Sequence, residues 1–162
     1  MSYRAVSELH ILPPKQTVDQ HYYVDEILTK SLVPAMKRRR KTGSILERSF
    51  MPNMSKAIFQ QDGAPAHSSK KAMSWLEAHV GLFWGKGIWP GNSPDLSPIE
   101  NLWSIVQSKL NEMPAATNRD SLIKNVKTAW SEIDPDTLEN LICGMPERIK
   151  TCIKLKGAYI GK

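Results

Sequence analysis

Cysteine is scarce in this chain of 162 residues, which holds only Cys143 and Cys152. Their spacing matches neither a zinc knuckle nor a CxxC redox pair. Structural disulfides are concentrated in oxidising compartments, and their absence fits a reducing one. We therefore expect two idle thiols and a fold that depends on neither a disulfide nor a zinc site.

Long apolar runs are also absent. No run of 18 consecutive apolar residues occurs, which argues against a membrane-spanning helix. The first 16 residues lack the cationic stretch followed by an apolar stretch that is typical of a secretory signal. We therefore expect an intracellular protein without a membrane partner.

Acidic residues are outnumbered by basic ones. The chain has 22 Lys and Arg against 16 Asp and Glu, which gives a net charge of +6. Such an excess favours polyanionic partners, because a cation placed on a phosphate releases condensed counterions. A generic solvated basic surface is the alternative. The hydrophobic content of 41% is ordinary for a globular protein, and the length suits one domain.

Strand and helix patterns alternate along the first part of the chain. The predicted strands lie at residues 7–12, at 57–61 and toward the end of 82–89. The predicted helices cover about residues 17–40, 70–79, 97–113, 118–133 and 134–142. Pro34 is expected to kink or end the first helix. The alternation indicates an α/β domain whose C-terminal half is helical.

The first concentration of polar residues is at residues 62–67 (DGAPAH). Asp62 directly follows a predicted apolar strand, so its carboxylate points to the C-terminal edge of the sheet. Ligand sites of open α/β sheets lie at that edge. The alternative is that Asp62 caps the turn that follows it, which aspartate does readily. Spacing alone leaves both interpretations open.

The second concentration is at residues 93–101 (SPDLSPIEN), which contain a strong helix start. Ser97 is the expected cap, and Pro98 is the first helical residue. Glu100 then has two interpretations. It completes a capping box with Ser97, or it offers a first-turn carboxylate, whose ionised form suits the helix dipole and a hard cation. On local grounds the capping box is favoured.

Taken together, residues 59–67 (FQQDGAPAH) and 89–103 (WPGNSPDLSPIENLW) resemble the catalytic core of mariner-type transposases. The order of the two motifs, with 37 residues between Asp62 and Glu100, is highly specific. A weaker resemblance extends over residues 7–103. This family belongs to the DDE endonucleases, which have a ribonuclease-H-like fold. The resemblance implies an incomplete ribonuclease-H-like fold over residues 1–113, with its first strand missing and residues 114–162 as a helical extension of the same domain.

The resemblance also implies a metal site. Asp62 matches the second catalytic carboxylate of the family, and Glu100 matches the third. In the family, three carboxylates hold two Mg²⁺ or Mn²⁺ ions. Two such ions about 3.5–4 Å apart activate the attacking oxygen and stabilise the leaving oxygen of a phosphoryl transfer. Carboxylate oxygens are ligands that these ions prefer.

The chain departs from the family at the first catalytic aspartate, which has no counterpart here. Asp19 and Asp25 fall in or beside the first predicted helix, and no family motif surrounds Glu8. The N-terminal DNA-binding domains of full transposases have no counterpart either. We therefore expect a truncated or decayed copy, or one exon of a longer gene, with little strand cleavage by this chain alone. A non-catalytic nucleic-acid-binding protein derived from a transposase is the alternative, and an unexpressed relic is a third interpretation.

Several further residues are candidates for accessory roles. His67 orients the site, contacts DNA, or is an ordinary loop histidine. Asn101 touches a substrate phosphate or is a solvated helix residue, which is slightly favoured. A run of five cations binds DNA, acts as a nuclear import signal, or is a solvated helix end. The run consists of Lys37, Arg38, Arg39, Arg40 and Lys41. From the resemblance we expect DNA as the partner, a homodimer in the full-length family, and a nuclear location.

Overall fold

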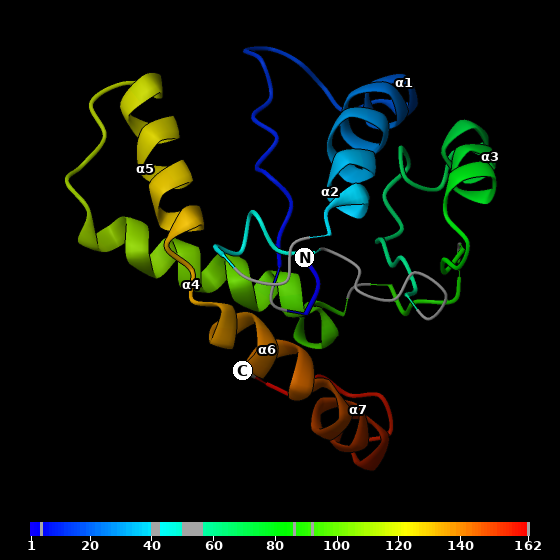
Figure 1. The fold of residues 1–162 in the computed structure, drawn as a ribbon. Helices are drawn as coiled ribbons and strands as arrows, with labels where there is room; N and C mark the ends of the chain where they lie inside the picture. The colour runs from blue at the N-terminus through cyan, green and yellow to red at the C-terminus, as the bar shows by residue number, and fades with distance from the viewer. Residues whose placement is uncertain (4, 40–42, 50–56, 86, 92, 162) are drawn as a thin grey trace. The chain divides into compact units, whose positions relative to one another are not determined.

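The computed structural model describes residues 1–3, 5–39, 43–49, 57–85, 87–91 and 93–161 (Figure 1). The chain divides into two compact units, each assembled from segments far apart in the sequence. One, which we call the α4–α7 unit, comprises Met1–Leu9, Arg40–Arg48 and Ser93–Lys162. The other, the α1–α3 unit, comprises His10–Arg39 and Ser49–Asn92. Each unit is described by itself.

The α4–α7 unit is built from four helices and a 3-10 turn. These elements are η2 (Pro94–Leu96), α4 (Pro98–Glu112), α5 (Arg119–Ser131), α6 (Pro135–Cys143) and α7 (Met145–Lys154). Local signals explain two of the starts. Asn118 and Ser121 form a reciprocal capping box at α5, and the Asp134 side chain accepts the N–H of Asp136 at α6. Each cap satisfies backbone donors that the first helical turn leaves without a partner.

The core of this unit joins α4, α5 and α6 to the beginning of the chain. Its buried side chains are Val6, Ile45, Leu102, Val106, Ala129, Trp130, Ile133 and Leu138. The Val6 N–H donates to the Ile45 carbonyl at 3.0 Å, and the Trp130 indole N–H donates to the Ser7 carbonyl at 3.0 Å. Burial of these apolar groups is the main stabilising term for the unit. The predicted boundary between residues 113 and 114 stays a prediction.

The α1–α3 unit begins with one continuous helical stretch that changes its pitch. It runs through α1 (Gln20–Tyr22), the π-helix η1 (Tyr23–Leu32) and α2 (Val33–Lys37). The Asp19 side chain caps it by accepting two backbone N–H groups. Of the two outcomes expected at Pro34, the end of the helix is wrong, since the chain stays helical to Lys37, and a kink stays a prediction. Proline has no backbone N–H, and its ring clashes with the carbonyl of the residue four positions earlier. The π-helical turns of η1, in which an N–H bonds to the carbonyl of the fifth preceding residue, end at Leu32, two residues before Pro34.

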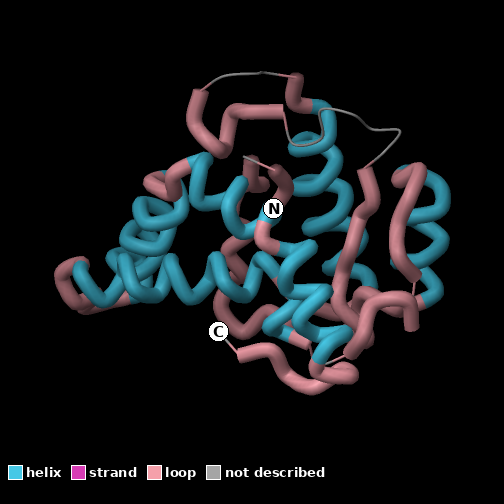
Figure 2. The backbone as a smooth tube through the Cα atoms, turned by 90° about the horizontal axis from the view of Figure 1, so that it is seen from below, coloured by secondary structure: helices cyan, strands magenta, loops and turns pink. Residues whose placement is uncertain are grey.

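The predicted strands are largely absent from the described part of the chain, as Figure 2 shows. Residues 7–12 form no strand, so this prediction is wrong, and the Ser7 carbonyl accepts the Trp130 indole N–H. Of residues 57–61, Phe59 alone is paired, through a parallel bridge to Phe83. Its N–H donates to Leu82 at 2.9 Å, and its carbonyl accepts from Trp84 at 3.0 Å. The pairing in residues 82–89 therefore lies at the start of the segment, and the prediction that it lies at the end is wrong.

The helix predictions are more accurate. The predicted helix at 70–79 is confirmed as α3 (Lys70–His79), with Ser69 as its cap, and α4, α5 and α6 lie where the sequence places them. Helix α7 was not expected. Cys143 and Cys152 are free thiols, of which Cys143 is exposed and Cys152 is half-buried. No helix among the described residues combines the length and the apolar character that a membrane crossing requires.

Candidate active site

Asp62 lies in the loop that follows the Phe59 bridge, in the α1–α3 unit. Its side chain is 72% exposed, and its Oδ1 accepts the Ala64 N–H at 3.0 Å and contacts Nδ1 of His67 at 2.5 Å. Its Oδ2 forms no hydrogen bond with any residue that the structure describes. Asp62 therefore stabilises the following turn with one oxygen and presents the other to solvent, so the two interpretations of this residue are compatible.

His67 is held by Tyr23 at its ring and by Gln61 at its backbone carbonyl. Its side chain is 24% exposed, and its ring lies against the ring of Tyr23, with centroids 4.1 Å apart and an interplanar angle of 36°. The Tyr23 hydroxyl donates to Oε1 of Gln61 at 2.7 Å, and Nε2 of Gln61 donates to the His67 carbonyl at 2.9 Å. Burial, together with the negative charge of Asp62, raises the pKa of Tyr23. The tyrosine therefore stays a hydrogen-bond donor.

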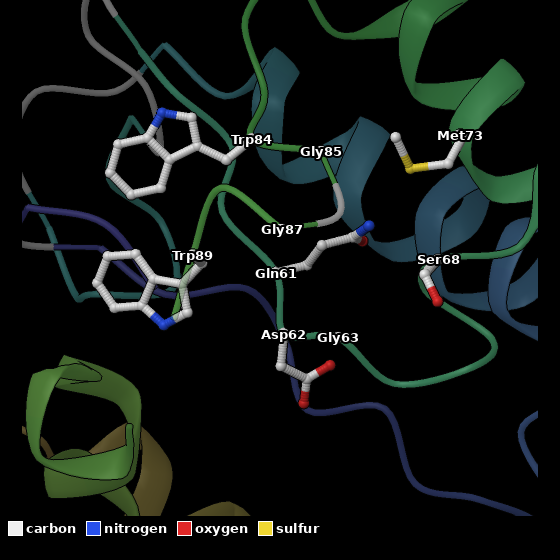
Figure 3. Close-up of a pocket in the computed structure, with 9 residues that line it drawn as sticks. All are labelled: Gln61, Asp62, Gly63, Ser68, Met73, Trp84, Gly85, Gly87 and Trp89. Atoms are coloured by element: carbon white, nitrogen blue, oxygen red, sulfur yellow. The ribbon is translucent and has the colours of Figure 1, made fainter. Parts of the chain in front are cut away.

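A small hollow of about 30 Å³ lies beside Asp62. Figure 3 shows the indoles of Trp84 and Trp89 on one side of it and Met73 with Ser68 on the other. The two indoles are stacked, with centroids 5.4 Å apart and an interplanar angle of 17°. The volume suits a water molecule or a bare ion and is too small for a nucleobase. The indoles are close enough to Asp62 to report on a ligand that binds there.

Glu100 lies in the first turn of α4, in the α4–α7 unit, and is exposed. The capping box that local reasoning favoured is wrong, because the Ser97 side chain makes no capping hydrogen bond. The Glu100 carboxylate forms no hydrogen bond or ion pair with the described residues. Asn101 donates from Nδ2 to the Ser97 carbonyl at 3.0 Å, so this half-buried amide supports the start of the helix. The carboxylate of Glu100 is therefore available to a ligand.

A larger hollow of about 160 Å³ adjoins Glu100, and no motif in the sequence predicts it. Its lining includes Asp95 and Ser104 together with Tyr159 and Gly161 from the end of the chain. Oδ2 of Asp95 accepts the Ile160 N–H at 2.9 Å, and the Asp95 carbonyl accepts a hydrogen bond from Arg148 at 3.2 Å. Asp95 thus ties the segment after α7 to the start of α4.

The basic run lies only partly within the described residues. Lys37 ends α2 and is exposed, Arg38 is half-buried, and Arg39 is exposed. The Arg39 guanidinium donates to the Met36 carbonyl at 2.6 Å, which is the contact expected of a cation at a helix end. Arg40 and Lys41 lie outside the described residues. A role of this run in DNA binding stays a prediction.

The two carboxylates belong to different units, so their convergence on a shared ion stays a prediction. Within the described residues there is no group of three or more His, Cys, Asp or Glu arranged to hold a metal. Asp62 and Glu100 are nevertheless oxygen donors of the type that Mg²⁺ and Mn²⁺ bind, and each has an unengaged oxygen. The donor chemistry fits such an ion, with water or a substrate phosphate supplying further ligands.

The fold defines the class of protein. It matches the crystal structure of the catalytic domain of Mos1 mariner transposase with a TM-score of 0.75 over 94% of this chain and 69% of that chain, at 23% sequence identity. This match shows the ribonuclease-H-like fold that the resemblance implies, and the absence of the first strand stays a prediction. Residues 36–123 match the family model of the DDE superfamily endonucleases, and this range includes both Asp62 and Glu100. The chain belongs to the DDE superfamily endonuclease family.

Relatives of known identity agree with this assignment. The chain is 37% identical over 101 residues to the transposable element Tc1 transposase of Caenorhabditis elegans, and 33% identical over 119 residues to the Tcb1 transposase of Caenorhabditis briggsae. These matches cover 62% and 70% of this chain. They cover only 35% and 42% of the two relatives, so the chain spans less than half of their length. The resemblance to mariner-type transposases is confirmed.

Two further solved structures of Mos1 match over the same 94% of this chain. One is the Mos1 transposase catalytic domain with raltegravir and Mn. This match has a TM-score of 0.73 and 23% identity, and it covers 70% of that chain. The other is a Mos1 paired-end complex with the left transposon end, at a TM-score of 0.71 and 23% identity, and covers 40% of that chain. At this identity the likeness shows the fold alone.

Proposed function

We propose that this chain is the part of a DNA transposase that contributes Asp62 and Glu100 to metal-dependent phosphoryl transfer on DNA. One observation carries the proposal. Both residues lie in the range matched by the endonuclease family, and both keep a carboxylate oxygen free of contacts with the described residues. A Glu100 that served only a capping box would have its carboxylate engaged by the backbone N–H of the cap residue, and it forms no such bond with the described residues.

In this proposal Oδ2 of Asp62 and the carboxylate of Glu100 hold Mg²⁺ or Mn²⁺. When bound, the ions neutralise phosphate charge and activate the attacking oxygen. His67 and the Ala64 N–H fix the Asp62 carboxylate by holding its other oxygen. Glu100 lies in the first turn of α4. The Mos1 structure with Mn supports the choice of metal.

DNA is the proposed substrate and partner. The net charge of +6 favours a polyanion, and Mos1 forms a paired-end complex with a transposon end. A complex that joins two transposon ends suits a dimer, which we propose for the full-length protein. Because the substrate is chromosomal DNA, we propose that the protein acts in the nucleus, with the cationic run that begins at Lys37 as an import signal.

We expect the 162-residue polypeptide by itself to cleave DNA little or not at all. The resemblance requires three carboxylates, and the matched motifs supply Asp62 and Glu100. Loss of one ligand weakens the binding of the metal pair and leaves phosphate charge uncompensated. A Mg²⁺-dependent nicking assay tests this expectation, and turnover that Asp62→Ala abolishes would show that it is wrong.

Metal binding is the direct test of the proposed function. Mn²⁺ is titrated into the wild type, Asp62→Asn and Glu100→Gln, and binding is followed by tryptophan fluorescence. We expect saturable binding that either substitution weakens by a factor of about 10 or more, since each removes a charged ligand. Glu112→Gln is the matched control, because Glu112 is an exposed carboxylate at the other end of α4.

The same titration separates the proposal from its alternative. If Mn²⁺ has no effect in any variant while DNA binding remains salt-sensitive, the chain is a non-catalytic nucleic-acid-binding protein. If Glu112→Gln weakens Mn²⁺ binding as much as Glu100→Gln does, the ion binds diffusely to surface carboxylates, and the assigned site is wrong.

A further inference from the structure

A closed series of contacts links Asp62 to Tyr23 in the helical stretch of the α1–α3 unit. The Tyr23 hydroxyl donates to Gln61, the Gln61 amide donates to the His67 carbonyl, and the His67 ring contacts Asp62. The Tyr23 ring also packs directly on the His67 ring. Tyr23 therefore contacts His67 by two routes, one through its ring and one through the Gln61 side chain.

The contact between His67 and Asp62 has a defined chemical direction. A carboxylate oxygen accepts, so Nδ1 of His67 must carry the hydrogen in this contact. The terminal torsion angle of an aspartate side chain has a broad distribution of values. Two hydrogen-bond donors on Oδ1 restrict the values that this angle can take in Asp62. With Oδ1 held by His67 and Ala64, Oδ2 has no hydrogen-bond partner among the described residues. The orientation of the histidine thus decides the orientation of the free oxygen.

His67 is less buried than Tyr23, the residue on which its ring packs. Its side chain is partly exposed, at 24%, whereas Tyr23 is 4% exposed and packed in the unit. A buried ring is restricted by its neighbours in a way that a loop side chain is not. Tyr23 is therefore the fixed member of the series, and His67 is the member that it restrains.

We propose that Tyr23 is a positioning residue that, through His67 and Gln61, sets the orientation of the Asp62 carboxylate for a divalent cation. The inference rests on the proposed function, because it assigns Tyr23 a part in the same metal site. Tyr23 would not contact the ion itself, since its contacts are to Gln61 and His67 and the ion would be bound by Asp62. Partners of this kind typically orient a ligand and raise its affinity.

Mn²⁺ affinity in hydroxyl-deletion variants tests the role of Tyr23. Tyr23→Phe keeps the ring on His67 and removes only the hydrogen bond to Gln61, so the fold should be kept. We expect Mn²⁺ binding to weaken on the order of 3- to 10-fold, less than the roughly 10- to 100-fold typical of direct outer-shell partners. Tyr22→Phe is the matched control. Its hydroxyl bonds Nε2 of His10 at 2.8 Å and takes no part in the series.

A second measurement reads the positioning without any metal. Long-range ¹⁵N NMR of His67, at a pH where the ring is neutral, distinguishes hydrogen on Nδ1 from hydrogen on Nε2. We expect the Nδ1–H form in the wild type and in Tyr22→Phe. We expect a mixture of forms in Tyr23→Phe, and a larger shift toward Nε2–H in Tyr23→Leu, which removes the ring. Circular dichroism confirms that each variant is folded.

The two measurements separate the inference from the proposed function. If the wild type shows no Mn²⁺ binding that depends on Asp62, the proposed function fails, and the His67 signal still decides whether Tyr23 orients Asp62. If Asp62-dependent binding is present and Tyr23→Phe changes neither the Mn²⁺ affinity nor the His67 signal, the positioning role is overturned. Equal effects of Tyr22→Phe and Tyr23→Phe would also overturn it, because the effect would then be a general loss of packing.

Discussion

Leu102 follows Glu100 by two positions on α4, and the two side chains have opposite environments. Leu102 is fully buried in the core of the α4–α7 unit, whereas Glu100 is exposed. Two helical residues turn the side-chain direction by about 200°, so such a pair lies on opposite faces. The same turn of helix therefore anchors α4 in the core and presents a carboxylate to solvent.

Substitution of Leu102 tests this anchoring. Leu102→Ala removes buried methyl groups and leaves a cavity, so we expect the free energy of unfolding to fall by about 2–5 kcal/mol. Urea denaturation followed by tryptophan fluorescence measures it, since Trp103 and Trp130 are stacked in the same unit. Leu122→Ala is the control, because Leu122 is 49% exposed. A loss of equal size in the control would contradict the assignment of Leu102 to the core.

At the same scale, the sequence identified some residues of the site and missed others. Asp62, Glu100 and His67 stand in recognisable motifs, so the sequence predicts them as candidates. Tyr23 and Gln61 carry no such signal, because their roles come from a contact between segments far apart in the chain. The contact of Asp62 with His67 is local, within one loop, and the structure supplies it; the sequence predicted only that His67 orients the site, contacts DNA or is an ordinary loop histidine.

At the scale of elements, the helix starts follow local chemistry closely. Asn118 and Asp134 begin their helices as predicted, because a cap needs only a side-chain oxygen next to free N–H groups. Helix α7 has no counterpart among the predicted helices. Pro146 occupies its first turn, where the missing N–H of proline has no consequence.

The cap at Asp19 gives a pH-dependent contribution to stability. The hydrogen bond from the Tyr22 N–H, then that from His21, lowers the pKa of Asp19 below its ordinary value of 3.8. A lowered pKa in the folded state means that the contribution is complete above the unfolded value and is lost as the pH falls through the folded value. Below pH 3.8 the cap should therefore weaken progressively.

Asp19→Asn isolates this contribution, because asparagine also caps helices and does not titrate. Unfolding free energies of the wild type and the variant are compared between about pH 2 and 6. We expect the wild type to lose stability relative to the variant as the pH falls below the ordinary aspartate value. A difference that is constant over the whole range would show that the Asp19 pKa is the same in the folded and unfolded states.

At the scale of the whole molecule, the net charge of +6 predicts salt-sensitive binding to DNA. The logarithm of the association constant should fall linearly with the logarithm of salt concentration, with a slope of about −0.9 per phosphate contacted. Fluorescence anisotropy with a labelled duplex measures this slope. A slope near zero would show that electrostatic contacts do not drive binding.

The double variant Lys37→Gln with Arg39→Gln tests the basic run in the same assay. If both cations contact phosphates, the magnitude of the slope should fall by about 2. Lys124→Gln with Lys127→Gln removes the same charge from exposed positions on α5 and serves as the control. Equal effects of the two double variants would indicate a generic basic surface.

The sequence by itself predicts the family, the candidate carboxylates and most helix starts. Motifs, caps and helical periodicity depend only on neighbours along the chain. Contacts between distant segments decided the rest. They brought the Tyr23 ring onto His67 and the Tyr23 hydroxyl onto Gln61. In the described residues, the expected strands are reduced to the bridge between Phe59 and Phe83. A strand needs a hydrogen-bonding partner from another segment, and its own residues do not specify that partner.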